Sequence, residues 1–114
     1  MIQVEVLISS LQGIQKEWME DVRDFLKEEF PHLSLVSFYS MPTIKLKGRH
    51  FVSFMANNKF FSMHTIDFEM IDKLSTLMKY PDHSKATTRI KYDQPSDFNA
   101  MKQIVKEIII RNQK

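Results

Sequence analysis

Hydrophobic residues recur at helical spacing along residues 11–30, and a proline at position 31 ends the pattern. At 100° per residue these side chains share one face: Leu11, Ile14, Trp18, Val22, Phe25 and Leu26. The spacing predicts the longest helix of the chain, from about Gly13 to Phe30.

The first ten residues fit either a helix or a strand. In "IQVEVLI" β-branched residues alternate with polar ones, which is typical of a strand. Val4, Leu7, Ile8 and Leu11, however, follow a near-helical spacing. We expect a short helix over residues 2–10.

From Leu33 the period changes to two, which indicates strands. Four segments carry this pattern: "LSLVSFY", "TIKL", "HFVSFMA" and "KFFSMH". Met41-Pro42 is expected to interrupt the first of them, since proline cannot donate to a ladder. Gly48 and the residues 57–59 (Asn-Asn-Lys) supply turns, so the block predicts an antiparallel meander.

The remaining third of the chain alternates between helix and strand signals. Asp67 is expected to be the N-cap of a helix that ends before Pro81, and "TTRIKY" is expected to form a last strand. Pro95 opens a final helix with this apolar stripe: Phe98, Met101, Ile104, Val105 and Ile108. The sequence therefore predicts one α+β domain over residues 1–114, an antiparallel sheet of four to five strands packed by N-terminal, middle and C-terminal helices.

Composition narrows the class of protein. The 114 residues are 43% hydrophobic and 26% charged, which is ordinary for a globular domain. The absence of cysteine excludes disulfides and thiolate sites. The longest apolar run near the C-terminus, residues 108–110, is too short to cross a bilayer, and the first residues lack the basic start of a signal peptide. We therefore expect a cytoplasmic protein with no membrane partner.

Charge is distributed unevenly along the chain. Residues 1–30 carry a net charge of −4 and residues 31–114 a net charge of +6, although the whole chain carries only +2. This asymmetry predicts an acidic helix beside a more basic sheet. The total is too small to predict a nucleic-acid partner.

The hairpin "YSMPTIKLKGRHFVSF" and the helix before it resemble the YdhG-like family of small bacterial proteins of unknown function. The matching positions are Tyr39, Met41, Pro42, Thr43, Lys45, Gly48, Arg49 and Phe54, followed by Lys85, Thr87 and Pro95. Ser40 and Ala86 stand where that family usually has glycine, and Phe60 near where many members have histidine. The resemblance implies a YdhG-like α+β fold, and some members are described as frataxin-like iron chaperones.

A row of carboxylates is the candidate metal site. Glu17, Asp21, Asp24 and Glu28 are spaced four, three and four residues apart, so they line one face of the long predicted helix. Hard cations prefer oxygen ligands, and the family resemblance implies that such a row could collect iron. The alternative is the solvated face that any amphipathic helix has, with Lys16, Arg23 and Lys27 beside it.

The hairpin is the candidate ligand site. We expect a ligand to border the bend from Tyr39 to Thr43, with these side chains in reach: Tyr39, Met41, Pro42, Thr43 and His50. Lys45, Lys47 and Arg49 near aromatic rings also supply the ingredients of a single-stranded nucleic-acid platform. The same alternation is typical of a plain sheet with one wet face, which is the interpretation we favour.

No motif predicts catalysis. The serines lack a nucleophile-elbow pattern, two glycines cannot build a phosphate loop, and the four histidines lack the spacing of a helical zinc site. His50 and His64 could meet across the meander. We expect a non-enzymatic binding protein whose partner is iron, by resemblance, or a protein acceptor. The alternatives are a metal-free protein-interaction or small-molecule module, or a single-strand binder.

Overall fold

The computed structural model describes residues 3–113, which form four helices and five strands. The helices are α1 (Val4–Ser9), α2 (Gly13–Glu29), α3 (Phe68–Leu77) and α4 (Pro95–Arg111). The strands are β1 (Val36–Phe38), β2 (Met41–Lys45), β3 (Phe51–Ala56), β4 (Phe60–Thr65) and β5 (Thr87–Lys91). The predicted α+β class, with an antiparallel meander, is confirmed.

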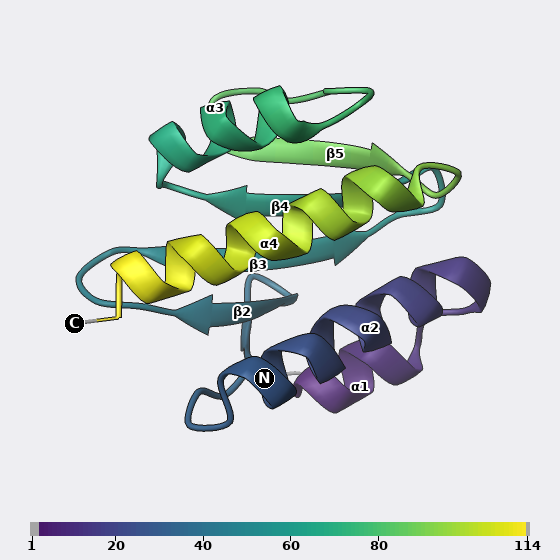
Figure 1. The fold of residues 1–114 in the computed structure, drawn as a ribbon. Helices are drawn as coiled ribbons and strands as arrows, with labels where there is room; N and C mark the ends of the chain where they lie inside the picture. Colours follow the sequence, from purple (N-terminus) through teal and green to yellow (C-terminus); the bar gives the residue numbers. More distant parts are fainter. Residues whose placement is uncertain (1–2, 114) are drawn as a thin grey trace.

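The strands lie in the sheet in chain order, β1-β2-β3-β4-β5, and every neighbouring pair is antiparallel. The helices lie together on one face of this sheet, with α4 crossing its middle (Figure 1). Alternation along each strand sends large apolar residues to that face, among them Ile44, Phe54 and Ile90, which are fully buried. The result is a two-layer domain with one sheet face free of helices.

The helix expected over residues 2–10 is confirmed from Val4 to Ser9, and residue 2 lies outside the described residues. Ile8 is its buried residue and joins the main core, while Val6 on the other side is 56% exposed. The long helix is also confirmed, since α2 ends at Glu29 and Phe30 follows as its buried C-cap residue.

The break in the first predicted strand lies two residues earlier than expected. Phe38 pairs with Met41, so Tyr39 and Ser40 form a two-residue hairpin turn with φ of 51° and 58°. Two positive φ values are what such a turn requires for its twist to match the strands. The expectation that Met41-Pro42 interrupts the strand is wrong.

Pro42 lies inside β2, which has a neighbour on both sides. The β2–β3 register begins at Thr43, so proline, which has no N–H to donate, stands just beyond the end of that ladder. Its ring is buried on the helix-covered side of the sheet, in the lining of a small cavity of about 140 Å³. The proline therefore ends a ladder and contributes to packing.

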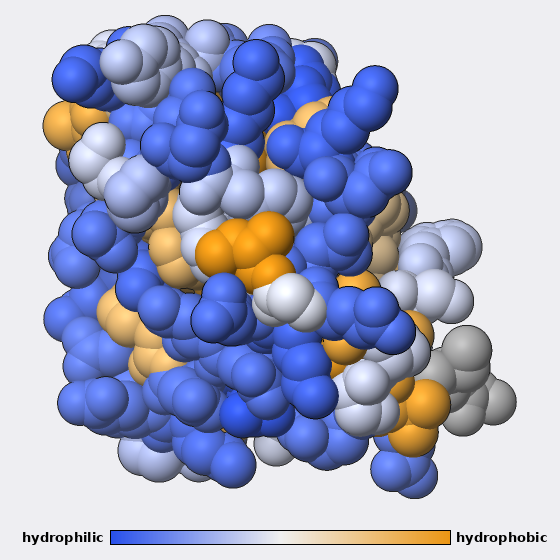
Figure 2. All heavy atoms as spheres, turned by 90° about the vertical axis from the view of Figure 1, so that its right-hand side faces the viewer, coloured by the Kyte–Doolittle hydropathy of each residue, from blue (hydrophilic) through white to orange (hydrophobic). Residues whose placement is uncertain are grey.

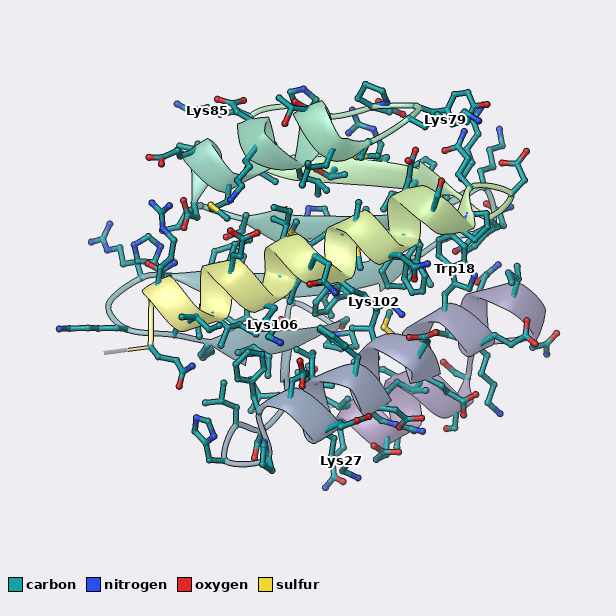
Figure 3. The ribbon with its side chains drawn as sticks, viewed as in Figure 1. Trp18, Lys27, Lys79, Lys85, Lys102 and Lys106 are labelled. Atoms are coloured by element: carbon teal, nitrogen blue, oxygen red, sulfur yellow. The ribbon has the colours of Figure 1, made fainter. Side chains whose placement is uncertain are left out.

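Aromatic packing joins α2, α4 and the sheet. Trp18 points from α2 towards the first turns of α4 (Figure 3), where its ring stacks on Phe98 with centroids 4.0 Å apart. The edge of Tyr92 meets the same indole at 5.0 Å, and Phe61 of β4 lies at 6.0 Å. The Tyr92 hydroxyl donates to the backbone oxygens of Asn57 and Phe60, which ties the β3–β4 turn to this cluster.

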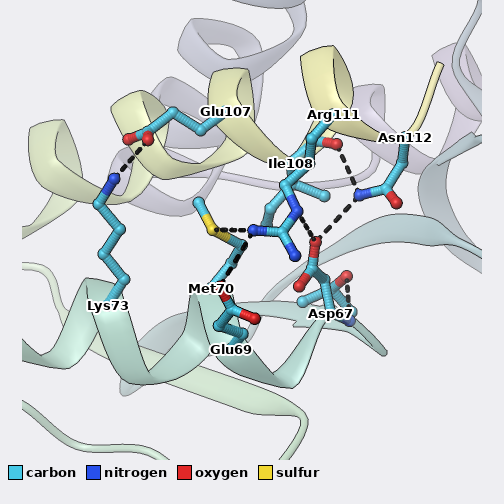
Figure 4. A network of polar contacts seen from close by, with 9 residues as sticks. Asp67, Glu69, Met70, Lys73, Glu107, Ile108, Arg111 and Asn112 are labelled. Carbon is cyan, nitrogen blue, oxygen red and sulfur yellow. Dashed lines mark hydrogen bonds and ion pairs between the residues drawn. The ribbon is translucent and has the colours of Figure 1, made fainter.

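Polar contacts join α3 to the end of α4 (Figure 4). Asp67 occupies the N-cap position of α3, as predicted, but its side chain makes no capping hydrogen bond. The carboxylate instead pairs with Arg111 at 3.1 Å and accepts from Asn112 at 3.0 Å, both at the end of α4. A capping role is therefore replaced by a contact between two elements that are far apart in the sequence.

On the side of the molecule that lies to the right in Figure 1, hydrophilic residues dominate the surface, and its apolar patches are small and separated (Figure 2). This side therefore offers no broad apolar interface. Within residues 3–113 no helix is both long and apolar enough to span a bilayer.

Candidate functional site: a groove beside the sheet edge

A groove of about 530 Å³ lies between the helices α1 and α2 and the segment of residues 31–37. Leu26 of α2, Leu35 and Ile44 contribute apolar side chains to its lining. Its charged groups are Glu5 of α1 and Arg23 of α2, together with Lys27 one turn further along. The size is within the usual range for sites that bind small ligands.

One wall of the groove is a sheet edge. β1 stands at the end of the strand order and pairs with β2 alone among the described residues. Residues of an antiparallel pair point their backbone groups alternately towards and away from the partner. Because Phe38 and Met41 close the two-residue turn, the N–H and C=O groups of Leu35 and Ser37 point outward, on the side where these residues line the groove.

Charge in the groove is partly neutralised. Arg23 lies 3.0 Å from Asp24 and 3.4 Å from Glu5. The hydrogen bond that Arg23 Nε donates to Asp24 raises the pKa of Arg23 above its usual value, with Coulombic contributions from Asp24, Glu5 and Glu20. Lys27 extends from α2 into solvent at the lower edge of Figure 3 and forms no ion pair within residues 3–113. Arg23 is thus neutralised by Glu5 and Asp24, and Lys27 is the groove cation that remains available to a ligand with negative charge.

The five residues of the predicted ligand site are not gathered at one place. Tyr39 is 82% exposed at the tip of the hairpin turn. Pro42 and Thr43 are both buried, but as neighbours on a strand they point to opposite faces of the sheet. Met41 is partly buried beside the turn, whereas His50 lies in the loop at the other end of β2. Of the five, Pro42 lines the small cavity near Ser40, and within residues 3–113 none of them lines the groove beside β1.

The carboxylates of the predicted metal site lie along α2, as the spacing indicated, and all four residues are exposed. Asp21 pairs with Lys102 of α4 at 2.7 Å, and Asp24 pairs with Arg23. In residues 3–113 no three acidic or histidine side chains come close enough together to hold a metal ion. Figure 3 shows Lys102 and Lys106 reaching from α4 towards α2, where they neutralise part of its acidic surface.

A row of small polar residues on the helix-free sheet face was not singled out from the sequence. Thr43 and Ser53 are cross-strand partners, and their hydroxyls lie 2.7 Å apart with no exposed surface. Further along the row, His64 Nδ1 is 2.9 Å from the Thr87 hydroxyl, and His64 Nε2 is 3.2 Å from that of Ser62. His64 is thus hydrogen-bonded to hydroxyls on β4 and β5 and does not meet His50. Period-two alternation was the signal that could have placed these residues on one face.

The environment of His64 makes stability depend on pH. Burial, and secondarily the charge of Arg89, lower the pKa of His64 below 6.5. The unfolded chain therefore takes up this proton at a higher pH than the folded chain, so the free energy of unfolding decreases as the pH falls below about 6.5. We expect His64→Gln to lose part of this decrease in urea unfolding measured from about pH 7.5 to about pH 5. The exposed His83→Gln is the control, and an unchanged slope in His64→Gln would contradict the assignment.

Comparison with known proteins identifies a similar fold through a solved structure but no relative in sequence. No protein-family model matches the chain, and no curated protein matches it in sequence. A crystal structure of YdhG from Bacillus subtilis, a protein of the DUF1801 family, superposes with a TM-score of 0.72 over 92% of this chain and 86% of that one. The two sequences are 15% identical, a level at which the likeness concerns the fold. The chain therefore has the fold of the DUF1801 protein YdhG, which confirms the YdhG-like architecture indicated by the hairpin sequence.

Proposed function

We propose that the chain is a non-enzymatic binding module that receives an extended peptide segment of another protein along the outer edge of β1. The observation that carries this proposal is the coincidence of a groove of about 530 Å³ with an unpaired strand edge. An extended peptide can add a strand to such an edge, because its backbone supplies the partners that the outward groups lack. Main-chain hydrogen bonds then provide affinity, and the groove provides specificity.

The side chains of the peptide would alternate between the groove and solvent. Those that enter the groove meet Leu26, Leu35 and Ile44, which favour an apolar residue. Lys27 favours a carboxylate within reach of the apolar residue, since Arg23 is already paired with Glu5 and Asp24. The expected ligand is therefore an extended segment that combines a large apolar side chain with Asp or Glu.

Iron handling stays a prediction from the family resemblance. The exposed carboxylates of α2 support only weak collection of a hard cation, because two of the four already have cationic partners. Ferrous iron added to isotope-labelled protein would broaden amide signals around Asp21 and Asp24 if α2 collects it. Peptide addition would instead shift signals of residues 33–37, so one spectrum separates the two functions.

The test begins with selection from a displayed library of random short peptides on the immobilised protein. N-methyl groups are then placed one at a time along a selected peptide. If the peptide adds to β1, methylation should weaken binding at every second position, by about tenfold where a hydrogen bond of roughly 1.4 kcal/mol is lost. Methylation has no such period if side chains alone provide the contact.

A matched pair of variants locates the site. Ser37 lines the groove and pairs with Pro42, so its half-buried side chain lies on the helix-covered side of the sheet. Ser37→Arg should therefore place a charge in the groove and weaken peptide binding at least about tenfold. Ile110 on α4 is 54% exposed and absent from the groove lining, so Ile110→Arg should bind as the unmodified protein does. Failure to select any peptide, or equal binding by both variants, would overturn the proposal.

A further inference from the structure

Charge is segregated between the two layers of the fold. Every acidic residue except Asp82 and Asp93 lies in a helix or at the N-cap position of α3. The five strands contain no acidic residue, and they carry Lys45, Arg89 and Lys91. The sheet is therefore the basic layer of a molecule whose net charge is small.

In each layer some cations are paired with carboxylates and others are not, and within residues 3–113 Lys27 of α2 forms no ion pair. Lys73, Lys102 and Lys106, on α3 and α4, each form an ion pair with a carboxylate of another helix. On the sheet, Arg89 pairs with Asp82, but neither Lys45 nor Lys91 has a carboxylate within ion-pair distance in residues 3–113. Both of these lysines are exposed and available to an anionic ligand.

The register places both lysines on the face that no helix covers, which points away from the viewer in Figure 1. Lys45 pairs across the strands with Phe51, which shares its face with Ser53 and Met55. At the diagonally opposite corner Lys91 pairs with Phe60, which shares its face with Ser62 and His64. Each corner therefore combines one lysine with one phenylalanine.

Aromatic rings gather at the first corner. The Phe38 ring lies 6.2 Å from the ring of Phe51 and 4.5 Å from that of Tyr39. Lys45 Nζ stands 4.8 Å from the centre of the Phe38 ring. Tyr39 is 82% exposed, so its ring is open to a ligand. Thr43 and Ser53 lie fully buried on this face, so the rings and the lysine form its outer surface.

We propose that this open sheet face binds single-stranded nucleic acid. Bases stack on Tyr39 and on the half-buried phenylalanines, and the phosphates lie against Lys45 and Lys91. Three strand spacings separate β2 from β5, about 15 Å, which gives room for a short stretch of unpaired nucleotides. Aromatic faces combined with unpaired cations favour a single strand over an acidic protein segment, because a carboxylate gains nothing from stacking.

Fluorescence anisotropy with a labelled thymidine oligonucleotide, at low and at moderate salt, tests this proposal on the whole protein. Tyr39→Ala should weaken binding by about fivefold to a hundredfold, the usual effect of losing one stacking ring. The double variant Lys45→Gln/Lys91→Gln should reduce the slope of log K against log salt by about 1.4, since each phosphate contact contributes about 0.7 for single strands. Both lysines are exposed, so this variant keeps the readout independent of any effect on folding.

Lys73→Gln is the matched control, because Lys73 is a half-exposed lysine in the helical layer and pairs with Glu107. It should leave both affinity and salt slope unchanged. Absence of binding at low salt, or equal losses in Lys73→Gln and in the double variant, would overturn the proposal. So would displacement of the oligonucleotide by poly-glutamate at lower concentration than by unlabelled oligonucleotide, which would identify an acidic protein surface as the better ligand.

Discussion

Trp18→Ala is expected to lower the free energy of unfolding by about 3–5 kcal/mol, the usual cost of truncating a buried tryptophan. The indole is 7% exposed and contacts the rings of Phe98 in α4, Tyr92 just after β5 and Phe61 in β4. No other aromatic ring of α2 makes these contacts, so the cavity would open where three elements meet. The loss would be a large fraction of the total stability of a domain, which is usually about 5–15 kcal/mol.

Urea unfolding followed by circular dichroism measures this effect. Trp18→Phe keeps an aromatic ring against Phe98 and should recover a large part of the loss, because it leaves a smaller cavity. Ile14→Ala, on the same helix but 42% exposed, should cost about 1 kcal/mol or less. A Trp18→Ala variant as stable as Ile14→Ala would contradict the central place of this cluster.

Asp97→Ala is expected to destabilise the fold by about 3 kcal/mol, although it removes a small polar side chain. The carboxylate is buried in the first turn of α4, at 1% residue exposure. Its Oδ1 accepts from the backbone N–H of Lys79 at 2.7 Å and its Oδ2 from that of Tyr80 at 3.0 Å. Alanine would leave two backbone donors without partners and would release the segment after α3 from α4.

Chemical unfolding and amide hydrogen exchange check this expectation together. Asp97→Asn retains one oxygen acceptor and should fall between the unmodified protein and Asp97→Ala. Exchange at the amides of Lys79 and Tyr80 should accelerate in Asp97→Ala more than exchange in the β3–β4 ladder does. The exposed Asp72→Ala, on α3, is the control, and a loss in Asp97→Ala no larger than in this control would remove the anchoring role.

The long helices could be predicted from the sequence because the spacing of their apolar residues defines the face that packs against the core. In α2 and α4 the apolar residues return every three or four positions, so the buried face of each helix follows from local spacing alone. Pro95 then occupies the first turn of α4, where its missing N–H costs nothing, as the sequence indicated. Gly48 has a φ of +66° in the turn between β2 and β3, where the sequence also predicted a turn.

The turn at Tyr39 and Ser40 could not be predicted by such rules. Neither residue is glycine or asparagine, which are the usual signals for two positive φ values. The strand pairing of Phe38 with Met41 holds these residues in that conformation, and this pairing depends on contacts made across the sheet. Local rules therefore predict the interruption at Pro42, although this proline lies inside β2.

The residues of the candidate sites could be identified in part from the sequence, but their grouping depends on the tertiary structure. Sequence reasoning identified the aromatic and basic residues of the hairpin, but Lys91 and Phe60 join that surface only because β4 and β5 extend the sheet. It assigned Tyr39, Thr43 and His50 to one place, whereas the strand β2 separates them by face and by length. The groove beside β1 depends on where α1 and α2 pack, and no local pattern encodes that position.

By itself the sequence determined the long helices α2 and α4 with their buried faces, the antiparallel meander and the contrast between an acidic helix and basic strands. These properties depend on residue spacing within a few turns or strand positions, where backbone geometry is fixed. Only the tertiary structure decided which strand is the free edge, which charges are paired and which side chains share the open face. Those features depend on register and on packing between distant segments, because a shift of one residue moves every side chain of a strand to the other face.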